Sequence, residues 1–175
     1  MNWYALFVEN GKEEIVQHFL NLYFDESSFK SIVPKRKIPE KKAGVIKHVF
    51  KKMFPGYVLI YTRMDYQVFN IIKKIPRCYN VVNSGCYHSK DAGTYFSQIE
   101  KCEMDLILKL TNDTGIIDYS KVYVENTKVN VKSGPLKGME GIIKKVDKRK
   151  NRAKLLINFM GLEKTVDVGI EIISN

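Results

Sequence analysis

Lysine and arginine residues form two dense clusters in this 175-residue chain, and their type and spacing could give the chain a chemical function. Residues 35–52 hold eight basic side chains against one glutamate, and residues 144–154 hold seven against one aspartate. The net charge of the whole chain is +10, so the segments outside the clusters are slightly acidic. Concentrated cations of this kind bind polyanions, and nucleic-acid phosphates are the expected ligand. The alternative for either cluster is a solvated, non-binding surface.

The expected nucleic-acid contacts are Lys35, Arg36, Lys37, Lys41, Lys42, Lys51, Lys52, Lys144, Lys145, Lys148, Arg149, Lys150, Arg152 and Lys154. These clusters hold few aromatic residues on which bases could stack. Recognition of the backbone and shape of a structured RNA is therefore favoured over reading of a single strand.

Patterns of catalysis are absent from the sequence. The histidines His18, His48 and His88 fall in unrelated segments, and no nucleophile elbow is found. The glycine-containing segment 134–138 lacks the spacing of a phosphate-binding loop. We therefore expect a binding protein and no enzyme.

Metal and disulfide chemistry is also disfavoured. Cys78, Cys86 and Cys102 are an odd number of cysteines without a CxxC pair, and adding His88 gives an irregular ligand spacing for zinc. No metal, cofactor or disulfide framework is expected. The chain also lacks an apolar run of membrane-spanning length and a signal peptide, which predicts a cytoplasmic protein with no membrane partner.

Residues 1–110 are expected to form an α+β domain with an antiparallel-rich sheet and helices on it. A central strand is predicted at residues 57–61, directly after the Pro55-Gly56 bend. The segment 34–44 reads as a basic loop or hairpin tip. Further strands are predicted at residues 3–8, 29–33, 45–52 and 79–82, and helices at residues 12–24, 64–75 and 97–110.

Residues 111–126 are expected to be a linker and residues 127–175 a small all-β barrel. Its five strands are predicted at residues 128–132, 141–146, 153–159, 164–168 and 170–173. The hairpin loop 147–152 places the second basic cluster at an exposed tip.

The segment from Val129 to Ile143 closely resembles the KOW motif. Together with Trp3-Tyr4 and the Phe54-Pro55-Gly56-Tyr57 strand entry, in this order, it resembles the NusG family of transcription elongation factors over nearly the whole chain. The resemblance implies an N-terminal NGN domain, a C-terminal KOW domain and bacterial transcription as the setting. Within the family, the basic charge and the loop pattern around residues 133–138 and 147–153 are most similar to the specialised paralogue LoaP.

In this family the NGN domain docks an apolar concavity on the clamp helices of RNA polymerase. The resemblance places Trp3, Phe54 and Tyr57 in that concavity, and strand alternation adds Leu59 or Ile60 as a neighbour. Exposed aromatic residues bury a large area on a partner and are frequent binding hot spots. The alternative is that these side chains fill the domain core.

The KOW domain departs from the family at one turn. General NusG proteins carry Ile-Phe-Gly-Arg there, and its phenylalanine contacts Rho or a small-subunit ribosomal protein. This chain has Phe159-Met160-Gly161-Leu162, so the partner surface is expected to consist of Phe159, Met160 and Leu162. Methionine can still fill an apolar pocket, but the arginine fork is lost. The change argues against Rho stimulation and ribosome coupling.

The predicted function is that of a processive antiterminator, expected to be a monomer, that binds RNA polymerase and nucleic acid. Nascent RNA, in the form of a hairpin, is the expected ligand, and non-template DNA is a further one. Two alternatives stay open, a ribosome-associated KOW protein and a general NusG factor that couples transcription to translation. The target operon, the recognised element and the dominant basic cluster are not encoded in a readable way.

Overall fold

The computed structural model describes residues 1–83, 96–125 and 128–174, which divide into two compact units. The first unit comprises residues 1–33 and 54–104, and the second comprises residues 34–53 and 105–175. Helix α3 (Lys101–Leu110) begins in the first unit and ends in the second. Among the described helices, none has both the length and the apolar content that a bilayer crossing requires.

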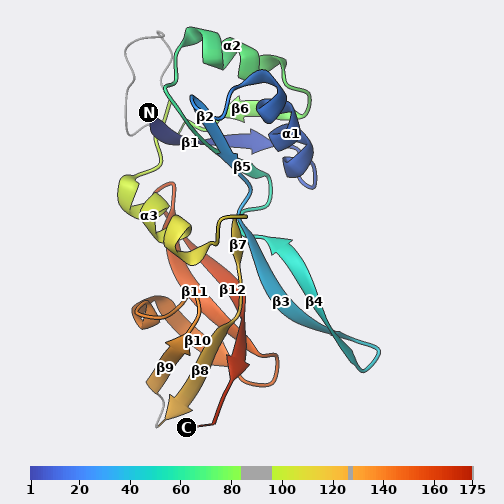
Figure 1. The fold of residues 1–175 in the computed structure, drawn as a ribbon, viewed down its shortest axis with the longest axis vertical. Helices are drawn as coiled ribbons and strands as arrows, with labels where there is room; N and C mark the ends of the chain where they lie inside the picture. Colours follow the sequence, from blue (N-terminus) through green and yellow to red (C-terminus); the bar gives the residue numbers. More distant parts are fainter. Residues whose placement is uncertain (84–95, 126–127, 175) are drawn as a thin grey trace. The chain divides into compact units, whose positions relative to one another are not determined.

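The first unit contains a four-stranded antiparallel sheet with the strand order β2-β5-β1-β6 (Figure 1). Its strands are β1 (Asn2–Val8), β2 (Phe29–Ile32), β5 (Tyr57–Thr62) and β6 (Cys78–Val81), and its helices are α1 (Glu13–Tyr23) and α2 (Tyr66–Lys74). Strand β5 lies inside the sheet, so the predicted central strand is confirmed.

One face of this sheet packs against both helices. Leu6 and Ile60 from the strands, Val16 and Leu20 from α1, and Ile72 from α2 belong to one cluster in which each is at most 1% exposed. The spacing of Val16 and Leu20 puts both on one helix face. Burying a large aliphatic side chain stabilises by about 1.5–3 kcal/mol, so this face is the main core of the unit.

Local signals fix the ends of these elements. Asp65 caps α2, because its Oδ1 accepts the main-chain N–H of Val68 at 2.8 Å. The predicted bend before β5 is present, with Gly56 at a φ of 81°. The N–H of Gly56 donates to Oε1 of the buried Glu13 at 2.7 Å, which ties the bend to the first turn of α1.

The second unit is built around a curled five-stranded sheet with the order β10-β11-β12-β8-β9. Its strands are β8 (Ser120–Glu125), β9 (Lys128–Ser133), β10 (Ile143–Asp147), β11 (Arg152–Phe159) and β12 (Leu162–Ile172), with a 3-10 turn η2 (Glu140–Ile142) before β10. Strands β3 (Lys35–Lys42) and β4 (Val45–Lys52) form a long hairpin, here called the arm, which also pairs with β7 (Ile116–Ile117) (Figure 1).

Several predicted elements of the first 110 residues need correction. The predicted basic loop or hairpin tip at residues 34–44 is one of them. Its residues 35–42 are instead strand β3, which pairs with β4 along its whole length, and only Ala43 and Gly44, with positive φ of 50° and 81°, form a hairpin tip. Helix α3 begins at Lys101 and not near residue 97, because Gln98 bridges to Tyr4 of β1 instead.

The five-stranded count in the C-terminal part is confirmed, but two members of the set differ. The strands predicted at residues 164–168 and 170–173 are one strand, β12, because Gly169 does not turn the chain. The fifth strand is β8, which pairs in parallel with the end of β12 and lies within the segment 111–126 predicted as a linker. Residues 126 and 127, at the predicted domain boundary, lie outside the described residues.

Candidate protein and nucleic-acid interfaces

Aromatic rings gather on the sheet face of the first unit that points away from its core cluster. They come from β1, β5 and β6, and we call this set the aromatic face: Trp3, Phe7, Tyr57, Tyr61 and Tyr79. Trp3 and Phe7 alternate along β1 with core residues, as strand geometry requires. Phe7 is 46% exposed and Tyr79 61% exposed.

The rings of the aromatic face contact one another across strands. The centroids of Trp3 and Tyr61 are 5.1 Å apart, and those of Phe7 lie 5.8 Å from Tyr57 and 5.5 Å from Tyr79. Tilted pairs at these distances are mutually stabilising and hold the rings in place. The face is therefore a preorganised apolar surface that can receive a partner.

The structure separates the five residues predicted to bind polymerase. Trp3 and Tyr57 lie on the aromatic face and are half-buried. Leu59 points to the same side but is fully buried opposite Ala5, between the two cross-strand aromatic pairs. Ile60 points into the helix-side core, and Phe54, in the bend, is only 5% exposed. Their binding role stays a prediction, and Trp3 and Tyr57 are the two that present ring surface on this face.

Sequence reasoning did not propose Phe7, Tyr61 or Tyr79 as site residues. Strand alternation along residues 3–8 and 57–61 could have identified Phe7 and Tyr61, because each lies two or four positions from a residue predicted to bind polymerase. Tyr79 is placed by a bulge in β6 opposite Phe7 and Val8, which no local pattern announces.

The arm carries the first basic cluster. Lys41, Lys42, Lys47 and Lys51 are exposed near its tip and outer strand, while Lys35, Arg36, Lys37 and Lys52 are half-buried nearer its base. Lys37 pairs with Asp118 at 3.2 Å. The hydrogen bonds that Oδ1 of Asp118 accepts from the Tyr119 N–H and from Nζ of Lys37 hold the pKa of Asp118 below its usual value. The distal lysines are thus the part of this cluster that faces solvent.

The turn between β10 and β11 carries the second basic cluster, as predicted. Lys148, Arg149 and Lys150 are exposed on it, and Oδ1 of Asp147 accepts the N–H of Lys150 at 3.0 Å. We call residues 147–152 the basic turn. Lys144, Lys145 and Lys154 are exposed on its two flanking strands.

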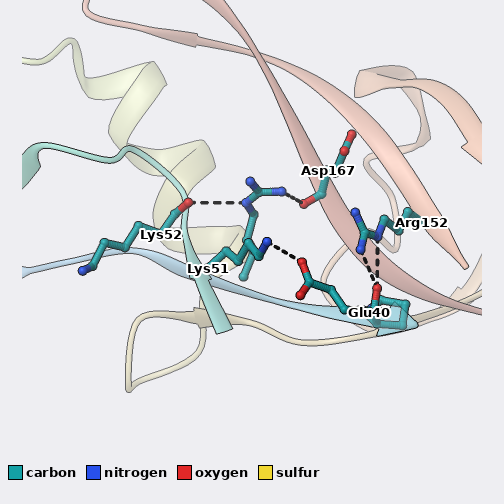
Figure 2. Close-up of polar contacts among 7 residues, drawn as sticks. Glu40, Lys51, Lys52, Arg152 and Asp167 are labelled. Carbon is teal, nitrogen blue, oxygen red and sulfur yellow. Dashed lines mark hydrogen bonds and ion pairs between the residues drawn. The ribbon is translucent and has the colours of Figure 1, made fainter. Parts of the chain in front are cut away.

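Two arginines of the predicted set are engaged with main-chain carbonyls inside the second unit (Figure 2). Arg152 donates from Nε and Nη2 to the carbonyl oxygen of Pro39 on the arm, at 3.2 and 2.6 Å. Arg36 donates from Nη1 to the carbonyl oxygen of Asp167 on β12 and from Nε to that of Lys52 at 3.4 Å. Burial lowers the pKa of the Arg36 guanidinium. The two basic clusters, more than a hundred positions apart, are therefore brought together.

The predicted KOW partner surface forms the tight turn between β11 and β12. Met160 and Gly161 both have positive φ, 55° and 73°, as in two-residue hairpin turns. Leu162 is 60% exposed and Met160 half-buried, whereas Phe159 is 1% exposed. Met160 and Leu162 thus present apolar surface there, and the partner role of all three stays a prediction. Cys86 and His88 lie outside the described residues, so the absence of a zinc site also stays a prediction.

Comparisons with known proteins give a consistent result. The family model described as NusG, transcription termination factor nusG, matches residues 1–108. The transcription termination/antitermination protein NusG of Haemophilus influenzae is 28% identical over 172 residues, covering 95% of this chain and 89% of that protein. The Bacillus subtilis protein of the same name is 27% identical over 175 residues, covering 95% and 94%.

A solved structure supports the fold. The structure titled "Domain interaction in Thermotoga maritima NusG" has a TM-score of 0.55 at 19% identity and covers 96% of this chain and 93% of that one. The α+β unit and the curled five-stranded sheet agree with it, so the predicted NGN-plus-KOW fold class is confirmed.

Proposed function

Since the chain belongs to the NusG family of transcription termination and antitermination factors, we propose that it is a processive antiterminator that binds RNA polymerase and nascent RNA. In this proposal residues 1–110 act as the polymerase-binding NGN domain and residues 127–175 as the KOW domain. Residues 111–126 connect them, and their part 120–125 is strand β8 of the five-stranded sheet. The protein acts in the cytoplasm as a monomer and by binding alone, without catalysis or a cofactor.

The observation that carries the polymerase part is the aromatic face. Trp3, Phe7, Tyr57, Tyr61 and Tyr79 form one ordered patch of rings, of which Phe7 and Tyr79 are largely exposed. A patch of this kind gains free energy by burial on an apolar helix surface, and aromatic side chains lose little conformational entropy on binding. The clamp helices of RNA polymerase are the proposed partner.

The nucleic-acid part rests on the exposed cations of the arm and of the basic turn. Lysine and arginine that contact phosphates release counterions, which makes binding strong at low salt and independent of base identity. Nascent RNA in a hairpin is the proposed ligand, and non-template DNA is the second ligand of the same chemistry. We further propose that the chain is a LoaP-type paralogue, since its basic charge and the sequence pattern of residues 133–138 and 147–153 resemble LoaP.

Antitermination, in place of the general NusG role, is supported by the β11–β12 turn. Met160 and Leu162 occupy the positions of phenylalanine and arginine in the general family pattern, so the turn lacks a cation that would pair with an acidic partner. Contact with Rho and with the ribosome is correspondingly weakened in this proposal.

Capture of purified bacterial RNA polymerase by the immobilised full-length protein tests the first part. Phe7→Ser removes a central ring of the aromatic face and should reduce capture by more than tenfold. The matched control is Tyr66→Ser, which removes an aromatic ring that is 64% exposed on α2. Equal capture by both variants would refute the aromatic face as the polymerase site, and co-sedimentation with ribosomes without polymerase capture would favour a ribosome-associated protein.

Transcription in vitro tests the second part. The protein should raise read-through of an intrinsic terminator on templates whose transcript forms an upstream hairpin. An increase in termination, or a requirement for Rho, would instead indicate a general NusG activity.

A further inference from the structure

A basic groove lies within the second unit, between the distal half of the arm and the basic turn. Its volume is about 940 Å³, and its cationic lining consists of Lys41 and Lys42 from the arm and Arg149, Lys150 and Arg152 from the turn. Five cations around one concavity concentrate positive potential more strongly than the same charges on separate convex surfaces. The groove therefore has the charge that a phosphate backbone requires.

The carboxylates among the described lining residues are already engaged. Glu40 forms an ion pair with Lys51, and the hydrogen bond from Lys51 lowers the pKa of Glu40 (Figure 2). Asp147 accepts the N–H of Lys150, so its charge serves to shape the turn. The charge of Arg152 also contributes to the lowered pKa of Glu40, so Glu40 offsets part of the positive potential on the Arg152 side of the groove.

The groove continues around the basic turn. A second, smaller cavity of about 240 Å³ shares Asp147, Lys150 and Arg152 with it and adds Lys145 and Lys154 from β10 and β11 and Asp167 from β12. The exposed cations of the flanking strands thus extend the first cavity. Together the two cavities are lined by seven cations and three carboxylates, so the combined track has a net positive charge.

Contacts from two arginines to main-chain carbonyls hold the walls of the groove together. Arg152 grips the carbonyl oxygen of Pro39 with two nitrogens, and Arg36 reaches the carbonyl oxygen of Asp167. Because a carbonyl acceptor carries no formal charge, this contact does not neutralise the positive charge of Arg152 while it positions the arm beside the turn. Arg152 is a positioning residue here, which differs from the free phosphate contact that the sequence suggests.

The ligand class follows from the lining. None of the described side chains around the groove is aromatic, and its apolar members are Pro39 and Ile46. Base stacking on rings, the usual means of holding single strands, is therefore not available. Shape and backbone contacts are the means by which proteins hold double-stranded RNA.

We infer that the arm and the basic turn form one composite site that clamps the phosphate backbone of an RNA duplex, with the arm as one jaw and the turn as the other. The inference rests on the proposed RNA-binding function and specifies its surface. It answers which basic cluster dominates: neither does, because each needs the other to close the groove.

Equilibrium binding of the full-length protein to an RNA hairpin, and to a single strand of equal length, tests the inference over a range of salt concentrations. The arm variant is Lys41→Gln/Lys42→Gln, the turn variant is Arg149→Gln/Lys150→Gln, and a third protein combines them. All four substituted residues are exposed and line the groove. Circular dichroism checks that each variant folds. The matched control is Lys128→Gln/Lys132→Gln, which removes the same charge from exposed positions on β9 of the same unit.

We expect the arm variant and the turn variant each to lose hairpin affinity by more than tenfold relative to the control. Each should make the slope of log affinity against log salt shallower by about two, one for each lost phosphate contact. The combined loss should be smaller than the product of the single losses, because one open jaw already weakens the contacts of the other.

Three results would overturn the inference. An arm variant that binds like the control would place the site on the turn alone, and single losses that multiply would indicate two independent patches. Selective binding of the single strand would contradict a duplex clamp. If the unmodified protein binds neither RNA, the proposed RNA-binding function fails as well, while polymerase capture remains a separate measurement.

Discussion

Gly169 offers a sharp test of whether the arm lies against the curled sheet. It sits in β12 opposite Arg152, and its backbone is not in the positive-φ region. A Cβ added there would lie 2.6 Å from the carbonyl oxygen of Lys37 on the arm and 2.8 Å from Cζ of Tyr119. Contacts this short require the arm or the ring to move.

The size and sign of the Gly169→Ala effect follow from two opposing terms. Overpacking of a close contact costs about 1–3 kcal/mol. Replacing glycine by alanine on an unstrained backbone stabilises by about 0.4–1 kcal/mol, because the unfolded chain loses freedom. The docked arm therefore predicts a net loss of about 1–2 kcal/mol in the second unit. If the arm does not contact β12, Gly169→Ala should cause a smaller loss of stability in the second unit, or a gain in its stability.

Hydrogen exchange of the full-length protein measures this unit directly. Amides of β3 and β12 should exchange roughly tenfold faster in Gly169→Ala, since about 1.4 kcal/mol corresponds to a factor of ten. The single tryptophan, Trp3, reports on the first unit by its fluorescence in urea, which should be unchanged. Gly141→Ala is the control, because among the described residues nothing lies within 4 Å of its added Cβ. Equal or slower exchange in Gly169→Ala than in Gly141→Ala would refute arm docking.

Further predictions concern other contacts. Arg152→Lys keeps the charge but loses the two-nitrogen grip on the Pro39 carbonyl, so arm amides should exchange about fivefold faster, for a loss of about 1 kcal/mol; unchanged exchange would show that the contact does not hold the arm. Met160→Asn should stabilise the second unit by about 1 kcal/mol in urea unfolding, because asparagine tolerates a φ of 55° better; a lower midpoint would mean that the methionine side chain contributes more by packing. At neutral pH iodoacetamide should label Cys78 more slowly than the exposed Cys102, because burial raises the pKa of Cys78 to about 11 and its thiolate is scarce. Peptide mass spectrometry reads both sites, the Cys78 rate should rise as pH approaches that pKa, and equal rates at neutral pH would contradict its burial.

Local signals sufficed for much of the first unit and for the basic turn. The Pro55-Gly56 bend, the strand after it and the aromatic alternation of Tyr57 and Tyr61 all depend on residues that are neighbours in the chain. The turn at residues 148–151 follows likewise from a polar segment between two apolar strands. Backbone preferences and the period of two in a strand act over a few residues, so they can be read directly.

The same alternation left one choice open that only packing could close. Leu59 and Ile60 are both apolar and adjacent, so they lie on opposite faces of β5, with Leu59 on the face of Tyr57, and either face could have been the core. The helices α1 and α2 cover the Ile60 side, which makes Ile60 core and leaves Leu59 between the two aromatic pairs of the other face. Which face a helix covers depends on the whole sheet and not on the strand itself.

The chain's own sequence determined the NusG-family fold class, the alternation of aromatic residues along β1 and β5, and the presence of two basic clusters. Tertiary structure alone decided that β8 completes the five-stranded sheet and that β12 runs through Gly169 without a break. It also decided that Arg36 and Arg152 donate hydrogen bonds to distant main-chain carbonyls of the second unit. The physical reason is separation along the chain. A main-chain carbonyl accepts from any well-placed donor regardless of the residue type that carries it, so no pattern in the sequence marks Pro39 or Asp167 as the partner of a distant arginine.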